Sequence, residues 1–152
     1  MPITFNLKTQ DIVDWLVPPQ EDIEKRCIKA LRRAMYDAVN YAKGLNTYKD
    51  RTSHLRSSVL FRTYKDGVLV DEFCSGTAEG ISNGRELADK KASGSQTKIL
   101  SVCVAGMNYA SYVEGKGFDV LTGAELRVEK IAKEYLDDAL KDTGVKVEIK
   151  NY

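Results

Sequence analysis

The chain has 152 residues, of which 43% are hydrophobic and 30% are charged, a balance typical of one globular domain and not of a disordered chain. Its 23 basic and 22 acidic residues nearly cancel, so the overall basic excess common in nucleic-acid-binding proteins is absent. No apolar run approaches the roughly 20 residues of a membrane span, and the N-terminus lacks the pattern of a secretory signal. We expect a single domain over residues 1–152 that folds in the cytoplasm.

The N-terminal segment predicts a short strand and then a helical turn. Residues 3–7 alternate apolar and polar side chains, which favours a strand. Residues 9–16 favour one or two helical turns anchored by Trp15. Pro18-Pro19 ends that stretch, since proline is tolerated only in the first turn of a helix.

The first long helix is expected over residues 20–43. Its apolar residues recur at three- and four-residue spacing and form one stripe, which is typical of an amphipathic helix. Gly44 follows the stripe and suits a left-handed position after the helix end. The stripe consists of Ile23, Cys27, Ile28, Leu31, Ala34, Met35, Ala38, Val39 and Ala42.

A β-hairpin is predicted next, with strands at 57–65 and 68–74. Asp66-Gly67 between them is a favoured pair for a two-residue type I′ turn. This turn predicts the pairs Lys65–Val68, Tyr64–Leu69, Arg62–Asp71 and Leu60–Phe73.

Residues 75–96 are polar and punctuated by glycine, and we interpret them as a long loop with at most one helical turn. Residues 97–105 follow as a strand. This strand is apolar on most of both faces, which predicts a central place in the sheet.

A second long helix is expected from Thr122, which with Glu125 matches a capping box, while Leu121 and Leu126 match a hydrophobic staple. Gly144 ends this helix, and residues 145–150 alternate as a final strand. The predicted fold is α+β with two layers, a mainly antiparallel sheet carrying both long amphipathic helices on one face. The buried stripe of the second helix is Val128, Ile131, Ala132, Tyr135, Leu136 and Ala139.

The sequence offers no complete catalytic or metal-binding motif. His54 lies near Ser57 and Ser58, but nucleophilic catalysis also needs an orienting carboxylate, and no GxSxG elbow is present. Residues 115–117 (Gly-Lys-Gly) lack the remaining parts of a phosphate-binding loop. We therefore expect no catalytic residue, no cofactor and no metal. The cysteines Cys27, Cys74 and Cys103 form no CxxC pair and are expected to be reduced and mostly buried.

A basic patch on the first helix leaves a nucleic-acid-binding module as an alternative. Basic residues there could contact phosphates. Acidic residues share the helix, so a solvated face of mixed charge is the default interpretation. The basic residues are Arg26, Lys29, Arg32 and Arg33, and the acidic ones are Glu21, Asp22, Glu24 and Asp37.

Two segments are more distinctive, residues 50–58 (Asp-Arg-Thr-Ser-His-Leu-Arg-Ser-Ser) and residues 109–115 (Tyr-Ala-Ser-Tyr-Val-Glu-Gly). In this order, between two long helices, they resemble the tail-completion or head–tail joining proteins of tailed bacteriophages and prophages. The resemblance covers about residues 20–140. Its signature residues, which we expect to be mainly structural, are Leu55, Ser58, Tyr109, Ala110, Tyr112, Val113, Glu114 and Gly115.

The resemblance implies a virion component that assembles in the bacterial cytoplasm. Its partners would be further copies of the chain, arranged in one ring, and other head–tail or tail-tube proteins, with no membrane and no nucleic acid. We expect Tyr109, Tyr112 and Val113 to pack on the sheet from one helical turn. The 75–96 loop is expected to order on a partner. The interface residues expected there are Asn83, Arg85, Lys90 and Lys91.

Overall fold

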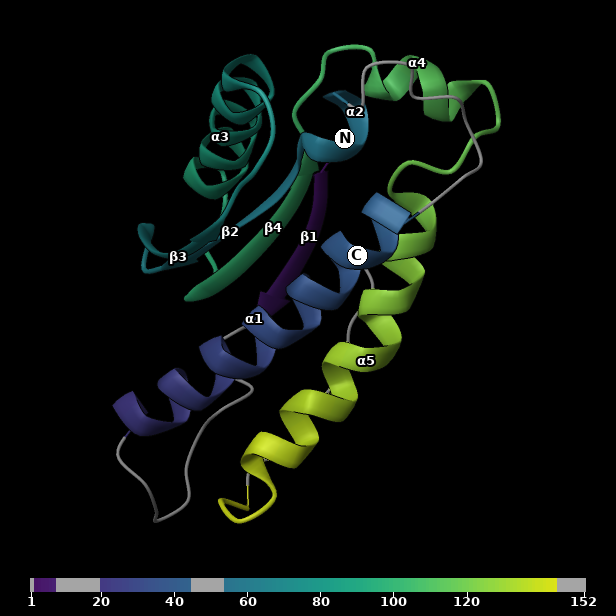
Figure 1. The fold of residues 1–152 in the computed structure, drawn as a ribbon. Helices are drawn as coiled ribbons and strands as arrows, with labels where there is room; N and C mark the ends of the chain where they lie inside the picture. Colours follow the sequence, from purple (N-terminus) through teal and green to yellow (C-terminus); the bar gives the residue numbers. More distant parts are fainter. Residues whose placement is uncertain (1, 8–19, 45–53, 145–152) are drawn as a thin grey trace.

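The computed structural model describes residues 2–7, 20–44 and 54–144, and its fold is α+β, as predicted (Figure 1). The turns predicted at 9–16, the final strand at 145–150 and residues 50–53 of the first motif lie outside the described residues. The strands are β1 (Pro2–Leu7), β2 (Val59–Lys65), β3 (Val68–Phe73) and β4 (Ile99–Ala105). The helices are α1 (Gln20–Gly44), α2 (His54–Ser57), α3 (Ala78–Ser93), α4 (Ala110–Gly115) and α5 (Thr122–Leu140).

The sheet is antiparallel throughout its described strands, in the order β1-β4-β2-β3. Every residue of β4 is buried, as are all residues of β2 except the last. This burial on both faces explains the nearly continuous apolar sequence of β4 and confirms its predicted central place. The strand expected at residues 3–7 is confirmed as β1.

The hairpin has the predicted turn but only part of the predicted register. Asp66 and Gly67 have φ angles of 51° and 80°, as a type I′ turn requires, and the two pairs next to the turn are as expected. A β-bulge then adds one residue to β3, so Arg62 pairs with Glu72 instead of Asp71. Leu60–Phe73 is wrong for the same reason, because Phe73 lies opposite Phe61.

Helices α1 and α5 lie together on one side of the sheet, where α5 packs along α1 (Figure 1). The predicted stripe of α1 is buried except for the partly buried Ile28. Tyr135 of α5 donates a hydrogen bond to Asp37 of α1 at 2.6 Å, and Arg33 stacks over the Tyr135 ring at 4.2 Å. Gly44 is the last residue of α1 and is not left-handed, which corrects the prediction for that position.

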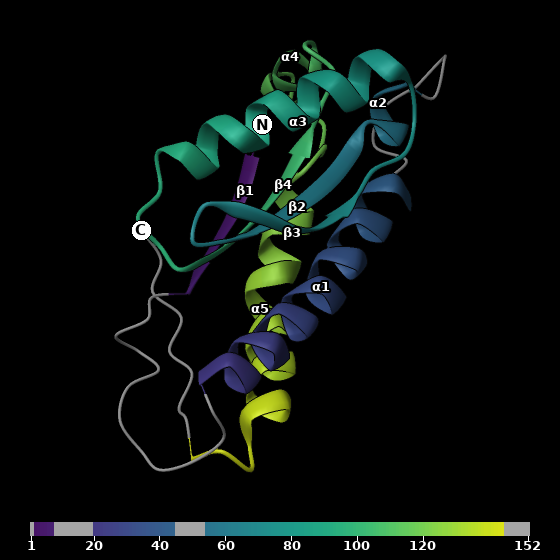
Figure 2. The same cartoon turned by 90° about the vertical axis from the view of Figure 1, so that its left-hand side faces the viewer.

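The other face of the sheet is covered by α3, so residues 75–96 are not the long loop that the sequence predicted (Figure 2). Thr77 caps the helix by accepting a hydrogen bond from the Gly80 amide at 3.1 Å. The sheet therefore separates two apolar clusters, one under α1 and α5 and one under α3. The buried residues of α3 are Gly80, Gly84, Ala88 and Ala92.

These small residues let α3 approach the sheet very closely. A Cβ atom added to Gly106, just after β4, would lie 1.8 Å from the carbonyl oxygen of Gly80. A Cβ atom added to Gly84 would lie 2.5 Å from Leu60 Cδ2. Gly80 and Gly84, which suggested a loop, thus lie where the helix meets its neighbours at very close range.

We predict that Gly106→Ala lowers the free energy of unfolding by about 3 kcal/mol, because the new methyl group meets a backbone oxygen that cannot rotate away. Gly44→Ala is the control, since its added Cβ atom has no neighbour within 4 Å and its φ angle is ordinary. Denaturant unfolding followed by circular dichroism measures both. Equal stability of the two variants would show that the contact between Gly106 and α3 is not tight.

A buried carboxylate joins the start of α1 to one end of the sheet. The Glu24 side chain is 4% exposed and accepts ion-pair contacts from Lys65 at 2.7 Å and Lys98 at 2.8 Å. Burial alone would raise the pKa of Glu24, but the hydrogen bonds and charges of the two lysines outweigh it, so this pKa is lowered. The sequence placed Glu24 on the solvated face of the helix, and that assignment is wrong.

We predict that Glu24→Gln lowers the free energy of unfolding at neutral pH by about 1.5–3 kcal/mol, because both lysines lose their anionic partner. A carboxyl group with a lowered folded-state pKa contributes stability above its unfolded pKa and loses it as pH falls through the folded value. The difference between wild type and Glu24→Gln should therefore shrink below pH 4.5, the ordinary value. Denaturant unfolding at several pH values measures it, and a difference that is independent of pH contradicts the assignment.

Candidate protein interface

The two signature segments meet at the end of the sheet. Leu55 is buried in the core under α1, and Ser58 is fully buried. Ser58 donates a side-chain hydrogen bond to the Leu55 carbonyl at 2.7 Å and accepts one from the Met107 amide at 3.4 Å. The Gly106 amide also donates to the Ser58 carbonyl at 3.1 Å. Through these bonds the first signature segment holds Gly106 and Met107, which connect β4 to the second signature segment.

The second segment forms α4, which ends at Gly115 as expected. Ala110 is buried and Val113 is partly buried against the core. Tyr112 is 67% exposed and Tyr109 is 38% exposed, so the prediction that both tyrosines pack on the sheet is wrong. They face outward because the short helix turns its alanine, and not its tyrosines, toward the core.

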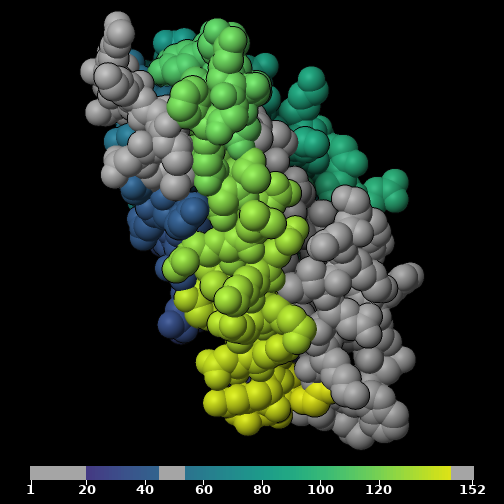
Figure 3. All heavy atoms as spheres, turned by 90° about the vertical axis from the view of Figure 1, so that its right-hand side faces the viewer, coloured from purple at the N-terminus to yellow at the C-terminus, as the bar shows by residue number. Residues whose placement is uncertain are grey.

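Glu114 of α4 caps the start of α5. Figure 3 shows the face of the molecule along which α4 and α5 follow one another. Its carboxylate accepts hydrogen bonds from the amides of Val120 at 2.7 Å and of Leu121 and Thr122 at 3.2 Å, and from the Thr122 hydroxyl. The predicted capping box is wrong, because Thr122 is already helical and its hydroxyl binds Glu114. The predicted staple is also wrong, because Leu126 is 65% exposed.

We predict that Glu114→Ala lowers the free energy of unfolding by about 1–2 kcal/mol, because three amides at the start of α5 lose their acceptor. Glu125→Ala is the matched control, since Glu125 is exposed and was the expected cap. Thermal unfolding of both variants makes the measurement. A larger loss of stability in Glu125→Ala than in Glu114→Ala would favour the capping box instead.

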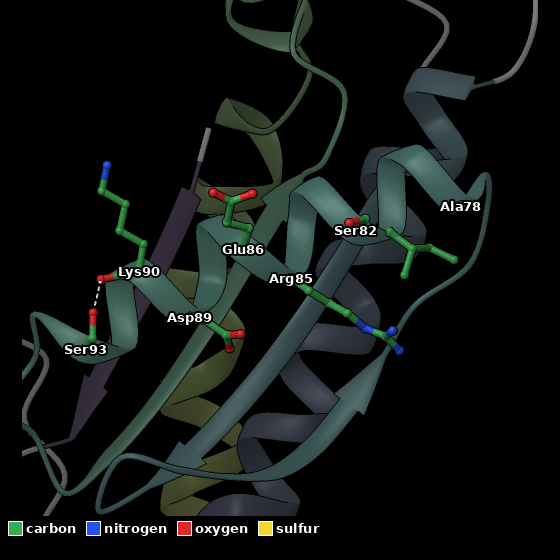
Figure 4. Close-up of a pocket in the computed structure, with 8 residues that line it drawn as sticks. Ala78, Ser82, Arg85, Glu86, Asp89, Lys90 and Ser93 are labelled. Carbon is green, nitrogen blue, oxygen red and sulfur yellow. Dashed lines mark hydrogen bonds between the residues drawn. The ribbon is translucent and has the colours of Figure 1, made fainter.

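The interface residues predicted from the sequence lie on α3. Arg85, Lys90 and Lys91 are exposed and Asn83 is partly buried, but they belong to a helix that covers the sheet, not to a loop that awaits a partner. In Figure 4, Lys90 and Glu86 point away from the sheet, whereas Arg85 reaches toward the hairpin. The predicted residues therefore lie on two different flanks of α3.

An ionic network ties α3 to the hairpin. Arg62 contacts Glu72 at 2.7 Å and Asp89 of α3 at 2.6 Å, and Arg85 of α3 contacts Glu72 at 2.5 Å. Burial would raise the pKa of Glu72, but its bonds to Arg85 and Cys74 and the positive charge of Arg62 lower it. Tyr64 donates to Asp89 at 2.6 Å, and burial together with this bond raises the pKa of Tyr64. These charged side chains pair with one another, and the pairs join α3 to the hairpin.

Surface hollows flank this network. A hollow of about 600 Å³ lies between the hairpin turn and the end of α3, with Tyr64, Asp66 and Lys98 among its lining residues. A second, of about 1060 Å³, runs along the outer face of α3 (Figure 4). Both are open to solvent and include charged side chains in their lining, in contrast to the enclosed sites that bind small molecules.

Among the sheet residues whose side chains the structure describes, the most exposed apolar ones lie at the start of β3. Val68 is 66% exposed, Leu69 is 39% exposed and Val70 is 46% exposed. Together these residues make the outer margin of β3, which we call the β3 edge. Three consecutive exposed apolar residues on an edge strand mark a surface suited to another protein. The sequence did not reveal this, because the same pattern also fits a buried strand.

The candidate nucleophiles of the sequence bind backbone groups instead of His54. Ser57 donates its side-chain hydrogen bond to the His54 carbonyl at 3.2 Å, and Ser58 donates to Leu55. A polar pair that the sequence did not suggest lies nearby, where Lys43 donates a hydrogen bond to Ser75. Burial lowers the pKa of Lys43. The Lys43 Nζ atom also lies 5.2 Å from the centre of the Phe73 ring. This pair joins the end of α1 to the segment before α3.

The basic residues of α1 are largely engaged within the chain. Arg26 contacts Asp22 at 3.2 Å, and Arg32 contacts Asp71 at 2.6 Å. Arg33 stacks on the Tyr135 ring. The two ion pairs partly offset the positive charge that this helix offers to phosphate groups, and the stacking holds the Arg33 guanidinium against α5.

The three cysteines are unpaired, and Cys27 and Cys103 are buried. Burial raises the pKa of Cys27 to about 11, with a further contribution from the charge of Glu24, and that of Cys103 to about 12. The described ranges contain no group of three or more histidine, cysteine or acidic residues that could hold a metal ion. Among the helices of these ranges, none has the length and apolar character of a membrane span.

Comparisons with known proteins identify no relative. No protein-family model matches the chain, and neither a curated protein nor a solved structure matches it.

Proposed function

We propose that this chain is a structural assembly protein of tailed bacteriophages, acting through protein–protein contacts where the head joins the tail, with several copies in a ring. The observation that supports a contact function most directly is the exposed β3 edge of Val68, Leu69 and Val70. The phage setting comes from the resemblance of residues 50–58 and 109–115. A ring requires a contact between two different surfaces of neighbouring copies.

The signature residues stabilise the fold and do not form a chemical site. Ser58 and Glu114 use their polar groups on neighbouring backbone amides. Tyr109, just before α4, and Tyr112, within α4, present exposed aromatic surface. Tyrosine is enriched at protein interfaces because it offers a large area at low entropic cost. We propose Tyr112 as a second contact residue.

The nucleic-acid alternative makes a separate prediction. If α1 bound phosphates, the chain would bind duplex DNA or RNA with an affinity that falls steeply with salt, and Arg32→Glu/Arg33→Glu would abolish it. Because Arg32 and Arg33 are engaged with Asp71 and Tyr135, we expect no salt-dependent binding in fluorescence anisotropy. Tight, salt-dependent binding that the double variant loses would favour the alternative.

The assembly proposal is tested in a phage that encodes this chain. We predict that a stop codon in its gene leaves separate heads and tails in the lysate, because the joint cannot form, and that electron microscopy shows them unjoined. Supplying the wild-type chain in the same cell should restore joined particles. Normal particles without the chain would refute the proposal. Removal of residues 77–93 is unsuitable as a test, because α3 covers one face of the core.

A further inference from the structure

The backbone of the β3 edge is open to another strand. In the order β1-β4-β2-β3, β3 lies at the margin, and within the described ranges only β2 pairs with it (Figure 1). In a two-residue hairpin the residues flanking the turn, here Lys65 and Val68, form a hydrogen-bonded pair. The next pair is then not hydrogen-bonded, so the backbone N–H and C=O of Leu69 point away from β2. This edge offers both backbone hydrogen bonds and apolar side chains.

The charged residues of β3 do little to protect this edge. Proteins usually protect edge strands with exposed charge, proline or a bulge. The bulge of β3 comes only after Leu69, and residues 68–70 carry no charge. Asp71 and Glu72 are engaged by arginines, through Arg32 for Asp71 and the Arg62–Arg85 pair for Glu72. An incoming strand would therefore meet an apolar stretch and carboxylates that are already partly neutralised.

The chain contains a segment with matching chemistry outside the described residues. Residues 145–150 alternate Val145, Val147 and Ile149 with two lysines and a glutamate, which gives one apolar and one charged face in an extended conformation. The segment has the six-residue length of β3. With its apolar residues on the face of Val68, its lysines would lie on the other face of the sheet, that of Leu69 and Glu72.

We infer that residues 145–150 of one copy, the donor segment, pair with the β3 edge of the next copy. Pairing of this kind gains affinity from main-chain hydrogen bonds and specificity from alternate side chains. Because the donor segment and the β3 edge are different parts of the chain, repeated contacts run head to tail, which is the kind of contact that a ring requires. The inference rests on the proposed self-assembly and names the contact that makes it.

Size exclusion coupled to light scattering tests the contact. Val68→Lys/Val70→Lys places two charges on the β3 edge, and Val147→Lys/Ile149→Lys removes the apolar face of the donor segment. We predict an oligomer for the wild type and monomers for both double variants. Leu126→Lys is the control, because Leu126 is as exposed as Val68 but lies on α5, and this variant should assemble like the wild type. Circular dichroism confirms that each variant is folded.

A mixing experiment separates this contact from general loss of association. The first double variant keeps its donor segment and the second keeps its β3 edge, so an equimolar mixture should form a one-to-one complex and nothing larger. Oligomers from either variant alone, or a monomeric wild type, overturn the inference. A mixture that stays monomeric overturns it too, because the two halves of the contact are then not complementary.

Failure of the inference and failure of the proposed function look different. If the first double variant restores joined phage particles, the β3 edge is not the assembly contact, although the proposed function stands. If the light-scattering results are as predicted but phage particles form without the chain, self-association through β3 stands and the phage role fails.

Discussion

The close contact between the Gly80 backbone and Gly106 determines most of the described architecture. Because neither residue has a side chain, α3 can rest directly on the connection that leaves β4. The helix then covers the second face of the sheet, which makes β2 and β4 buried on both sides and leaves β3 at the margin. The same connection is held by Ser58, so the core under α3 and the corner that carries α4 depend on one another.

Charged groups in this protein serve mainly to join elements. Glu24 joins α1 to the sheet through two lysines, and Arg62 joins the hairpin to α3 through Glu72 and Asp89. Such partly buried ion pairs are costly when one partner is lost, since the remaining charge stays desolvated. In the proposed assembly, contact with other molecules falls to apolar and aromatic residues, at the β3 edge and on α4.

The proposed assembly function and the architecture fit together at the sheet margin. A protein that works alone gains nothing from exposing Val68, Leu69 and Val70 together, and edge strands of this kind promote association. In the proposed contact, the exposed edge becomes the acceptor for a neighbouring copy. The fixed position of α3 beside it matters as well, because an acceptor held rigid by Arg62 and Arg85 loses less entropy on pairing.

The sequence by itself determined those features that depend on local spacing. The stripes of α1 and α5, the Asp66-Gly67 turn and the central strand β4 follow from periodicity and backbone preference, which act within a few residues. Only the tertiary structure decided the rest. The bulge places Arg62 opposite Glu72, Glu114 caps α5 from the preceding helix, and Tyr112 is exposed. None of these follows from the spacing of apolar residues. Residues 75–96 show the limit most clearly, because glycine at four-residue spacing marks a loop when neighbours are unknown and a tightly packed helix once Gly106 lies against it.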